Sequence, residues 1–327
     1  MLAEELRKAL QEVSVSDDAR SAVINEKELG ADDTGQLRHI IARELYTRWH
    51  IGRPVEDEPP SRTLRDPDLE ELLLAATPFE HTEIAVRALT EEDGNGQLLT
   101  EIEGVRVRVP AERVASRAWT GGEKPVTLRL DAVRAALSPG FFFTDRSRGR
   151  RDGKGGPTLR VYVHLLHSEA APRVWRLILE RLEDLGAPYR AKILSARGLF
   201  PRRDGIVVYL RPGAWHAVET VRDAVAESEE NGIGHEGSVF TDQLAPGVAT
   251  AWEPYDKRPG MKGLSFGEHR ALAVAEGLID HARHEESRFR EREVSVSAAL
   301  RRAGIDPLAP HRNLGSPTLD SKLSGGS

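Results

Sequence analysis

The segment TLRVYVHLL, residues 158–166, determines how the second half of this chain is expected to fold. Apolar and polar side chains alternate along it, and this period of two is that of a β-strand with two different faces. One face therefore carries Arg160, Tyr162 and His164, and the other carries Val161, Val163 and Leu165. The apolar face must pack in a core, whereas three polar side chains on the opposite face point either to solvent or into a lined cleft.

The residues after this strand predict further helices and strands. A helix that begins near Pro172 and ends at Gly186 turns one set of apolar residues inward, namely Trp175, Ile178, Leu179, Leu182 and Leu185. Strands are expected at 189–194 and 205–210, and a helix is expected over about 214–230. Ser265 and Glu268 have the spacing of a capping box, which predicts that the last long helix begins there.

The first part of the chain has a different pattern. It reads as helical and acidic, with an amphipathic helix that starts near Asp33 and stops at Gly52. From His81 to residue 130 the period changes to two, which predicts a small antiparallel sheet. We therefore expect an α+β protein in three parts: a helical plus small β region (1–137), a mainly antiparallel sheet flanked by helices (138–313) and a disordered tail (314–327).

Composition excludes several classes of protein. The 327 residues contain no cysteine, so a disulfide, a Cys₄ zinc site and a thiol nucleophile are impossible. The longest strictly apolar runs have five residues, far fewer than the roughly 20 that span a bilayer. The charged N-terminus lacks a signal-peptide core, so we expect a cytoplasmic protein without membrane contact. A net charge of −6 and 6% aromatic residues argue against a nucleic-acid partner.

Basic residues gather in two segments on either side of the predicted strand and helix. Residues 144–160 hold six basic residues against two acidic ones, and residues 187–211 hold six against Asp204 alone. Like charges repel, so such clusters need an anion or carboxylates to compensate them. One interpretation is a solvated basic face. Two clusters beside the same predicted strands favour a site for an anion, most simply a phosphate bound by guanidinium groups.

Two residues near these clusters can move protons. His164 lies on the polar face of its strand, although a strand histidine can equally be structural. Lys192 lies in YRAKIL among arginines, and each neighbouring cation should lower its pKa from ~10.4 because it disfavours the charged amine. A neutral amine can act as a base near neutral pH. The alternative is an ordinary exposed lysine on a strand.

Six short motifs then give the chain a family resemblance. In order they are FFFTDRSRGRRD, LRVYVHLL, YRAKIL, RRDGIVVYL, FTDQLAPGVATAWEP and LSFGEHRALAVAEGL. Together they resemble the HopA-type effector family over roughly residues 138–285. Members of that family include bacterial type III effectors and enzymes of class V lanthipeptide and thioamitide pathways. The resemblance implies a phosphoserine/phosphothreonine lyase, distantly similar to the SpvC/OspF phosphothreonine lyases.

The resemblance also implies roles for particular residues. In the SpvC/OspF enzymes a lysine removes the Cα proton and a histidine protonates the departing phosphate. By motif these roles fall on Lys192 and His164, and Tyr209 resembles a tyrosine that lines the lyase site. Expected phosphate ligands are Arg203 and Arg270, followed by Arg160, Tyr162 and Arg202. A lysine base, a histidine acid and an arginine cage can eliminate phosphate without a metal or an organic cofactor, so none is expected.

The implied partners are a phosphorylated precursor peptide and a separate Ser/Thr kinase that supplies it. Residues 1–137 are expected to bind the leader of the precursor or the kinase. The leader could add as a strand to the edge of the sheet at 81–130. The alternative from another class is a non-catalytic HopA-like interaction protein that recognises a phosphorylated or acidic partner.

Overall fold

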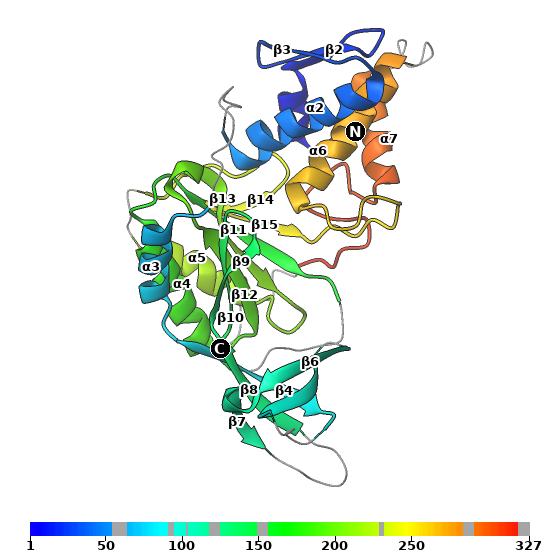
Figure 1. Cartoon of the computed structure of the whole chain (residues 1–327). Coiled ribbons are helices and arrows are strands. Elements are labelled where there is room, and N and C mark those ends of the chain that lie inside the picture. Colours follow the sequence, from blue (N-terminus) through cyan, green and yellow to red (C-terminus); the bar gives the residue numbers. More distant parts are fainter. Residues whose placement is uncertain are drawn as a thin grey trace.

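The structure, a computed structural model, describes residues 1–53, 64–90, 95–102, 104–117, 125–148, 156–228, 232–283 and 291–319. It confirms the expected α+β class. The described residues form seven α-helices and three antiparallel sheets. Figure 1 shows a group of helices at one end, the largest sheet in the middle and a smaller sheet at the other end.

The largest sheet has seven strands in the order β14-β15-β11-β13-β12-β10-β9. Their bounds are β9 Val133–Ser138, β10 Phe141–Asp145, β11 Leu159–Leu165, β12 Tyr189–Leu194, β13 Arg202–Leu210, β14 Asp242–Ala245 and β15 Val248–Trp252. Every pair of neighbours is antiparallel. The strand quoted first in the sequence, β11, lies in the centre between β13 and β15. The alternation along it therefore assigns a face to each of its side chains.

Helices cover the apolar face of this sheet (Figure 1). They are α3 (Pro67–Ala76), α4 (Ala171–Leu185) and α5 (Ala217–Glu227). Trp175 and Val161 are fully buried in the core between α4 and the sheet. Leu185, which the helical pattern turns inward, is 43% exposed. It is the last residue of α4, where the chain turns away from the sheet at Gly186 in a left-handed conformation.

Helices from both ends of the chain cover part of the opposite face. The long helix α6 (Phe266–Arg283) packs against α7 (Arg292–Arg302) and α2 (Thr34–Leu45). The predicted capping box is confirmed, because the Ser265 amide donates to Glu268 at 2.8 Å and the Glu268 amide donates to the Ser265 hydroxyl at 3.4 Å. The core of this group includes Tyr162 and Val207 from the central sheet.

The first 53 residues are less helical than their sequence suggests. After α1 (Glu4–Leu10) the chain forms a three-stranded antiparallel sheet, with β1 Val13–Val15, β2 Ser21–Ile24 and β3 Lys27–Gly30. The β-branched residues Val13, Val15, Val23 and Ile24 favour β1 and β2. Asn25 and Glu26 take positive φ angles in the turn between β2 and β3. The expected helix follows as α2, capped by Asp33, and continues as one π-helical segment, η1 (Tyr46–Ile51), up to Gly52.

The sheet predicted at 81–130 is confirmed and has five strands in the order β6-β5-β4-β8-β7. Their bounds are β4 His81–Ala88, β5 Gln97–Ile102, β6 Val105–Pro110, β7 Val114–Arg117 and β8 Pro125–Asp131, with a 3₁₀ turn, η2, at Ala111–Arg113. Ala132 alone separates β8 from β9, so the central sheet begins at Val133, before the expected boundary at residue 138.

Two further observations concern the expected tail and the membrane. Residues 314–319 of the expected tail are described, and Leu319 packs against the hydrophobic core of the central sheet, while residues 320–327 lie outside the described residues. In the described part of the chain, none of the helices has the length and apolar character needed to cross a membrane.

Replacing Trp175 tests the core between α4 and the sheet. Its side chain is completely buried and its indole nitrogen donates to the Thr77 hydroxyl at 3.1 Å. We expect Trp175→Ala to lower the free energy of unfolding by about 3–5 kcal/mol, because it leaves a cavity and removes a buried contact. Urea denaturation followed by circular dichroism measures this. Glu180→Ala, on the exposed side of the same helix, should stay within about 0.5 kcal/mol of the unchanged protein.

Candidate active site

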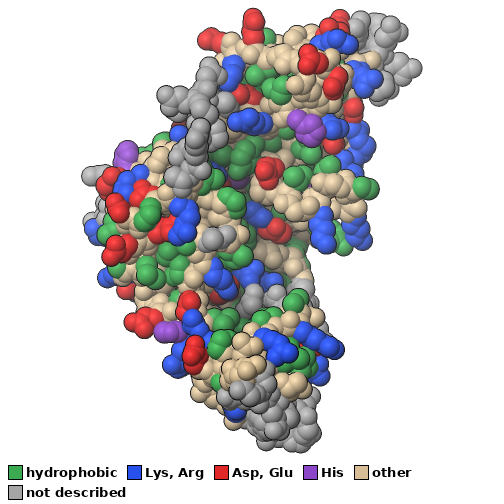
Figure 2. Space-filling model, viewed as in Figure 1, with side chains coloured by type: hydrophobic (Ala, Val, Ile, Leu, Met, Phe, Trp, Pro, Cys, Tyr) green, Lys and Arg blue, Asp and Glu red, His purple; other side chains and the backbone are tan. Residues whose placement is uncertain are grey.

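A cavity of about 880 Å³ lies on the polar face of the central sheet. Its floor comes from the strands and includes Phe141, Arg160, Tyr162, Lys192, Asp204 and Val207. Its walls come from η1, with Tyr46 and His50, and from the segment 253–265 that leads into α6. Figure 2 shows the surface hollowed between the helical group and the sheet, with Lys and Arg side chains around the hollow.

Lys192 places its amine at the floor of this cavity. Its Nζ lies 3.6 Å from the centroid of the Phe141 ring, and it makes no hydrogen bond or ion pair with any described residue. Burial, together with Arg160 and Arg202, lowers the pKa of Lys192 to about 8, although Asp204 acts in the opposite direction. The lowered pKa expected from the sequence is present, but its largest cause is burial and not the arginines.

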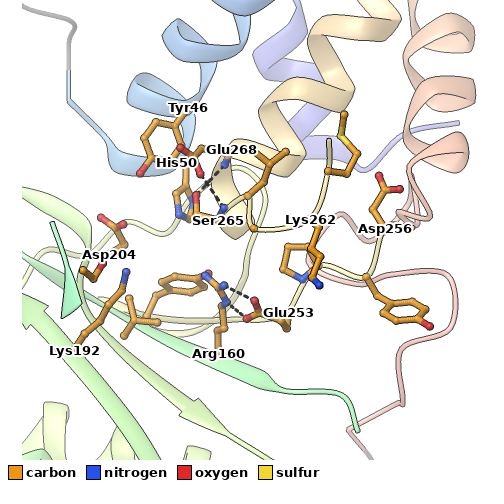
Figure 3. Close-up of a pocket in the computed structure, with 18 of the residues that line it drawn as sticks. Tyr46, His50, Arg160, Lys192, Asp204, Glu253, Asp256, Lys262, Ser265 and Glu268 are labelled. Carbon is orange, nitrogen blue, oxygen red and sulfur yellow. Dashed lines mark hydrogen bonds and ion pairs between the residues drawn. The ribbon is translucent and has the colours of Figure 1, made fainter. Parts of the chain in front are cut away.

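Arg160 and Tyr162 line the same cavity from β11. The Arg160 guanidinium forms a two-pronged ion pair with Glu253, with Nη2 donating to Oε1 at 2.7 Å and Nε donating to Oε2. Arg160 also lies over the ring of Tyr209, with its Cζ 5.1 Å from the centroid. Burial raises the pKa of the Tyr162 hydroxyl, so it stays protonated at neutral pH. Figure 3 shows the Arg160–Glu253 pair across the floor from Lys192.

Asp204 faces Lys192 (Figure 3). Arg202 donates to both of its carboxylate oxygens, at 2.7 and 2.8 Å, and also contacts the Tyr46 hydroxyl at 3.4 Å. Although burial opposes ionisation, Arg202 holds the pKa of Asp204 well below its usual value. Arg202 does not line the cavity itself, but it keeps a negative charge beside the Lys192 amine.

His50 is a site residue that the sequence pattern did not reveal. It is 3% exposed, and its ring meets the Tyr162 ring edge-on with centroids 5.5 Å apart and lies 5.6 Å from the Phe266 ring. Its Nδ1 is 3.1 Å from the Ser238 hydroxyl. Burial lowers the pKa of His50 to about 4, so the ring is neutral at pH 7. In the sequence, burial of His50 was indicated only by its position after Trp49, near the end of the predicted amphipathic helix.

Four other predicted residues do not line the cavity. His164 lies farther along β11, where its Nδ1 is 3.1 Å from the Glu236 carbonyl oxygen and burial lowers its pKa. Arg203 pairs with Glu236 and donates to the carbonyl oxygens of Arg48 and Trp49 at 3.2 and 3.4 Å. It therefore fastens η1 to β13.

Arg270 and Tyr209 are the other two. Arg270 is 0% exposed, and it donates to the Pro310 carbonyl oxygen at 2.9 Å and the Asn313 side chain at 3.0 Å. It joins α6 to the segment after α7, and burial lowers its pKa to about 9. Tyr209 stacks on Phe143 at 6.4 Å between centroids, next to Arg160 but outside the cavity lining.

Carboxylates compensate most of the second basic cluster. Four of its arginines are paired, as Arg190–Asp145, Arg197–Asp66, Arg202–Asp204 and Arg203–Glu236. Lys192 differs from them because it has no carboxylate partner among the described residues. In the first cluster, Arg160 reaches the cavity, and Arg150, Arg151 and Lys154 lie outside the described residues.

Comparison with known proteins identifies the family. The HopA1 effector protein family matches residues 132–312, more than half of the chain, and the chain belongs to this family. Two solved structures of effector proteins are similar to it, one from Pseudomonas syringae pv. tomato strain DC3000 and one from Pseudomonas syringae pv. syringae strain 61. Each has 12% sequence identity and covers 84% of this chain and 95% of its own, with TM-scores of 0.46 and 0.45. None of the curated proteins matches the chain.

The ionisation of Lys192 can be measured directly. We expect its amine to titrate near pH 8, and Asp204→Asn to move the midpoint lower, because the lost carboxylate no longer favours the charged amine. NMR of protein labelled with ¹³C-lysine follows the titration, and Lys192→Met assigns the signal. A midpoint near ~10.4, the value for a solvated lysine, would contradict the described environment.

Proposed function

We propose that this chain is a phosphoserine/phosphothreonine lyase that acts in the maturation of a ribosomally made peptide, such as a class V lanthipeptide or a thioamitide. Its substrate is a precursor peptide phosphorylated by a separate Ser/Thr kinase. Its product carries dehydroalanine or dehydrobutyrine. The observation that carries the proposal is the Lys192 amine, which has a lowered pKa, no described partner and a place at the base of the cavity.

In the proposed reaction the neutral Lys192 amine takes the proton from Cα of the phosphorylated residue. The electron pair of that C–H bond forms the Cα–Cβ double bond. The Cβ–O bond then breaks and its electrons leave with the phosphate. A proton delivered to the departing oxygen completes the balance, because Lys192 has gained one proton and the donor has lost one. Both exchange with water before the next turnover.

Arg160 and Lys262 are the proposed phosphate ligands. Glu253 holds Arg160 in the bidentate arrangement that guanidinium groups also form with phosphate, and its side chain is 39% exposed. A bound phosphate replaces this carboxylate on the same guanidinium. Lys262 also lines the cavity and forms no hydrogen bond or ion pair with a described residue.

His50 is the proposed proton donor to the departing phosphate. It lines the cavity, whereas His164, the donor expected from the family motif, does not. Burial lowers the pKa of His50 to about 4. A phosphate dianion beside the ring favours the imidazolium, so we expect His50 to take up its proton as the substrate binds.

Mass spectrometry tests the proposed activity. A phosphorylated Thr or Ser peptide incubated with the protein should become about 98 Da lighter, the mass of phosphoric acid. Lys192→Ala should lower the rate about 10²–10⁴-fold and leave phosphopeptide binding in place, because it removes the base alone. Lys8→Ala, on the exposed helix α1, is the control. Tight phosphopeptide binding without an unsaturated product would instead support the non-catalytic alternative.

A pair of histidine variants tests the proton donor. We expect His50→Asn to lower kcat about 10²-fold, because the departing phosphate loses its proton source. His164→Asn replaces another buried histidine that lies outside the cavity and should keep kcat nearly unchanged. Both are compared at equal folded fraction by circular dichroism. The reverse result, with His164→Asn slow and His50→Asn normal, would restore the role implied by the family motif.

A further inference from the structure

The segment 253–265, which forms one wall of the cavity, contains no helix or strand. Gly260 and Gly263 have positive φ angles, and a Cβ at either position would meet no other atom within 4 Å. The middle of the segment therefore faces open space, and its position depends on contacts at its ends. Figure 3 shows two residues near its start, Glu253 and Asp256.

Two side chains that do not line the cavity hold this start. The side-chain nitrogen of Asn313 donates to the Glu253 carbonyl oxygen at 2.8 Å. His269 of α6 places its Nε2 2.9 Å from a carboxylate oxygen of Asp256. Although burial opposes ionisation, Arg258 lowers the pKa of Asp256 to about 2. The carboxylate can therefore only accept a hydrogen bond, so the Nε2 of His269 carries the proton.

Arg270 connects these two side chains. Burial lowers the pKa of His269 to about 4, so its ring is neutral at pH 7 and its Nδ1 accepts a hydrogen bond. Arg270 donates to this Nδ1 from Nη1 at 2.8 Å, and to the Asn313 side-chain oxygen from Nη2 at 3.0 Å. Its Nε donates to the Pro310 carbonyl oxygen at 2.9 Å. One planar guanidinium therefore fixes three acceptors at once.

Arg270 differs from Arg160 and Arg202, because it forms no ion pair within the described part of the chain. The other two arginines are each paired with a carboxylate, whereas Arg270 is completely buried among neutral acceptors. Burying a cation without a charged partner costs free energy. Stability alone would favour an apolar side chain at this position, so the presence of a guanidinium favours a role in orienting its three acceptors.

We propose that Arg270, through His269 and Asn313, positions Arg160, one of the proposed phosphate ligands. The two intermediate side chains fix the start of the cavity wall, and this start carries Glu253, whose carboxylate holds the Arg160 guanidinium. Arg270 is a positioning residue, since it does not line the cavity and touches no reacting group. The inference rests on the proposed lyase function, because it explains how a guanidinium is held ready for the phosphate of that substrate.

The hydrogen on Nε of Arg160 reports on this arrangement, because it is donated to the Glu253 carboxylate. NMR of ¹⁵N-arginine-labelled protein measures its exchange with water without any substrate, and Arg160→Gln assigns the signal. We expect Asn313→Ala to speed the exchange about tenfold, since Glu253 loses one of its hydrogen bonds. Arg270→Lys should have a similar effect, because an ammonium keeps the charge but cannot hold three acceptors in one plane.

Binding of a phosphothreonine peptide, followed by fluorescence anisotropy, connects this arrangement to the phosphate site. Both variants should weaken binding about tenfold. In a chain that already carries Arg160→Gln, Asn313→Ala should change binding less than about twofold, because the group that it positions is absent. Arg312→Gln is the matched control, since this neighbour of Asn313 donates to the Ser316 carbonyl oxygen, and it should leave exchange and binding unchanged. All forms are compared at equal folded fraction by circular dichroism.

The possible results separate the positioning role from the lyase. Unchanged exchange in both variants would overturn the inference, and so would faster exchange with unchanged peptide binding. A loss of binding that persists undiminished in the Arg160→Gln chain would overturn it too, because the loss would not pass through Arg160. If the unchanged protein binds no phosphopeptide, the proposed function fails, and faster exchange in the variants still supports the positioning of Arg160.

Discussion

The contact between η1 and the polar face of the central sheet controls the environment of the cavity. His50 inserts between Tyr162 and Phe266, and Arg203 donates to two carbonyl oxygens at the end of the segment. There is no spare volume at this contact, because a Cβ on Gly267 would lie 2.1 Å from the His50 ring. Tyr46 and His50 of this segment line the same cavity as Lys192, and burial is the largest cause of the lowered pKa of Lys192. The chemistry proposed for residues on the sheet therefore depends on η1, which lies outside the family match at residues 132–312.

Arginines near the cavity are paired with carboxylates. Arg160 pairs with Glu253, and Arg202 pairs with Asp204. Ion pairs with at least one buried partner contribute little net stability, since desolvation offsets their attraction, but they fix the positions of both partners. Lys192 is left as a buried amine with a carboxylate nearby and no direct partner. A group in that state exchanges a proton readily, whereas a paired lysine holds it.

Local patterns predicted much of this fold. Alternation in TLRVYVHLL predicted the correct faces of β11, the strand expected at 189–194 is β12, and the capping box at Ser265 marked the start of α6. The three short strands at 13–30 were missed, because runs of three or four residues carry too little periodicity to separate them from a helical background. Two candidate residues, Arg203 and Arg270, have buried structural partners far along the chain. Contacts between residues so far apart in the chain do not affect the local spacing of apolar and polar residues. The burial of His50 could not be predicted for the same reason.

The helical group joins the two ends of the chain. The amide of Ala3 donates to the Pro307 carbonyl oxygen, and His50 meets Ser238 across 188 positions. During synthesis on a ribosome, the central strands emerge well after η1 and before its partners in α6. The strands that form the floor of the cavity can therefore pair while η1 still lacks its contacts with α6. Contacts of such high sequence separation form late and slowly. A nascent chain consequently lacks the finished cavity until α6 has been translated.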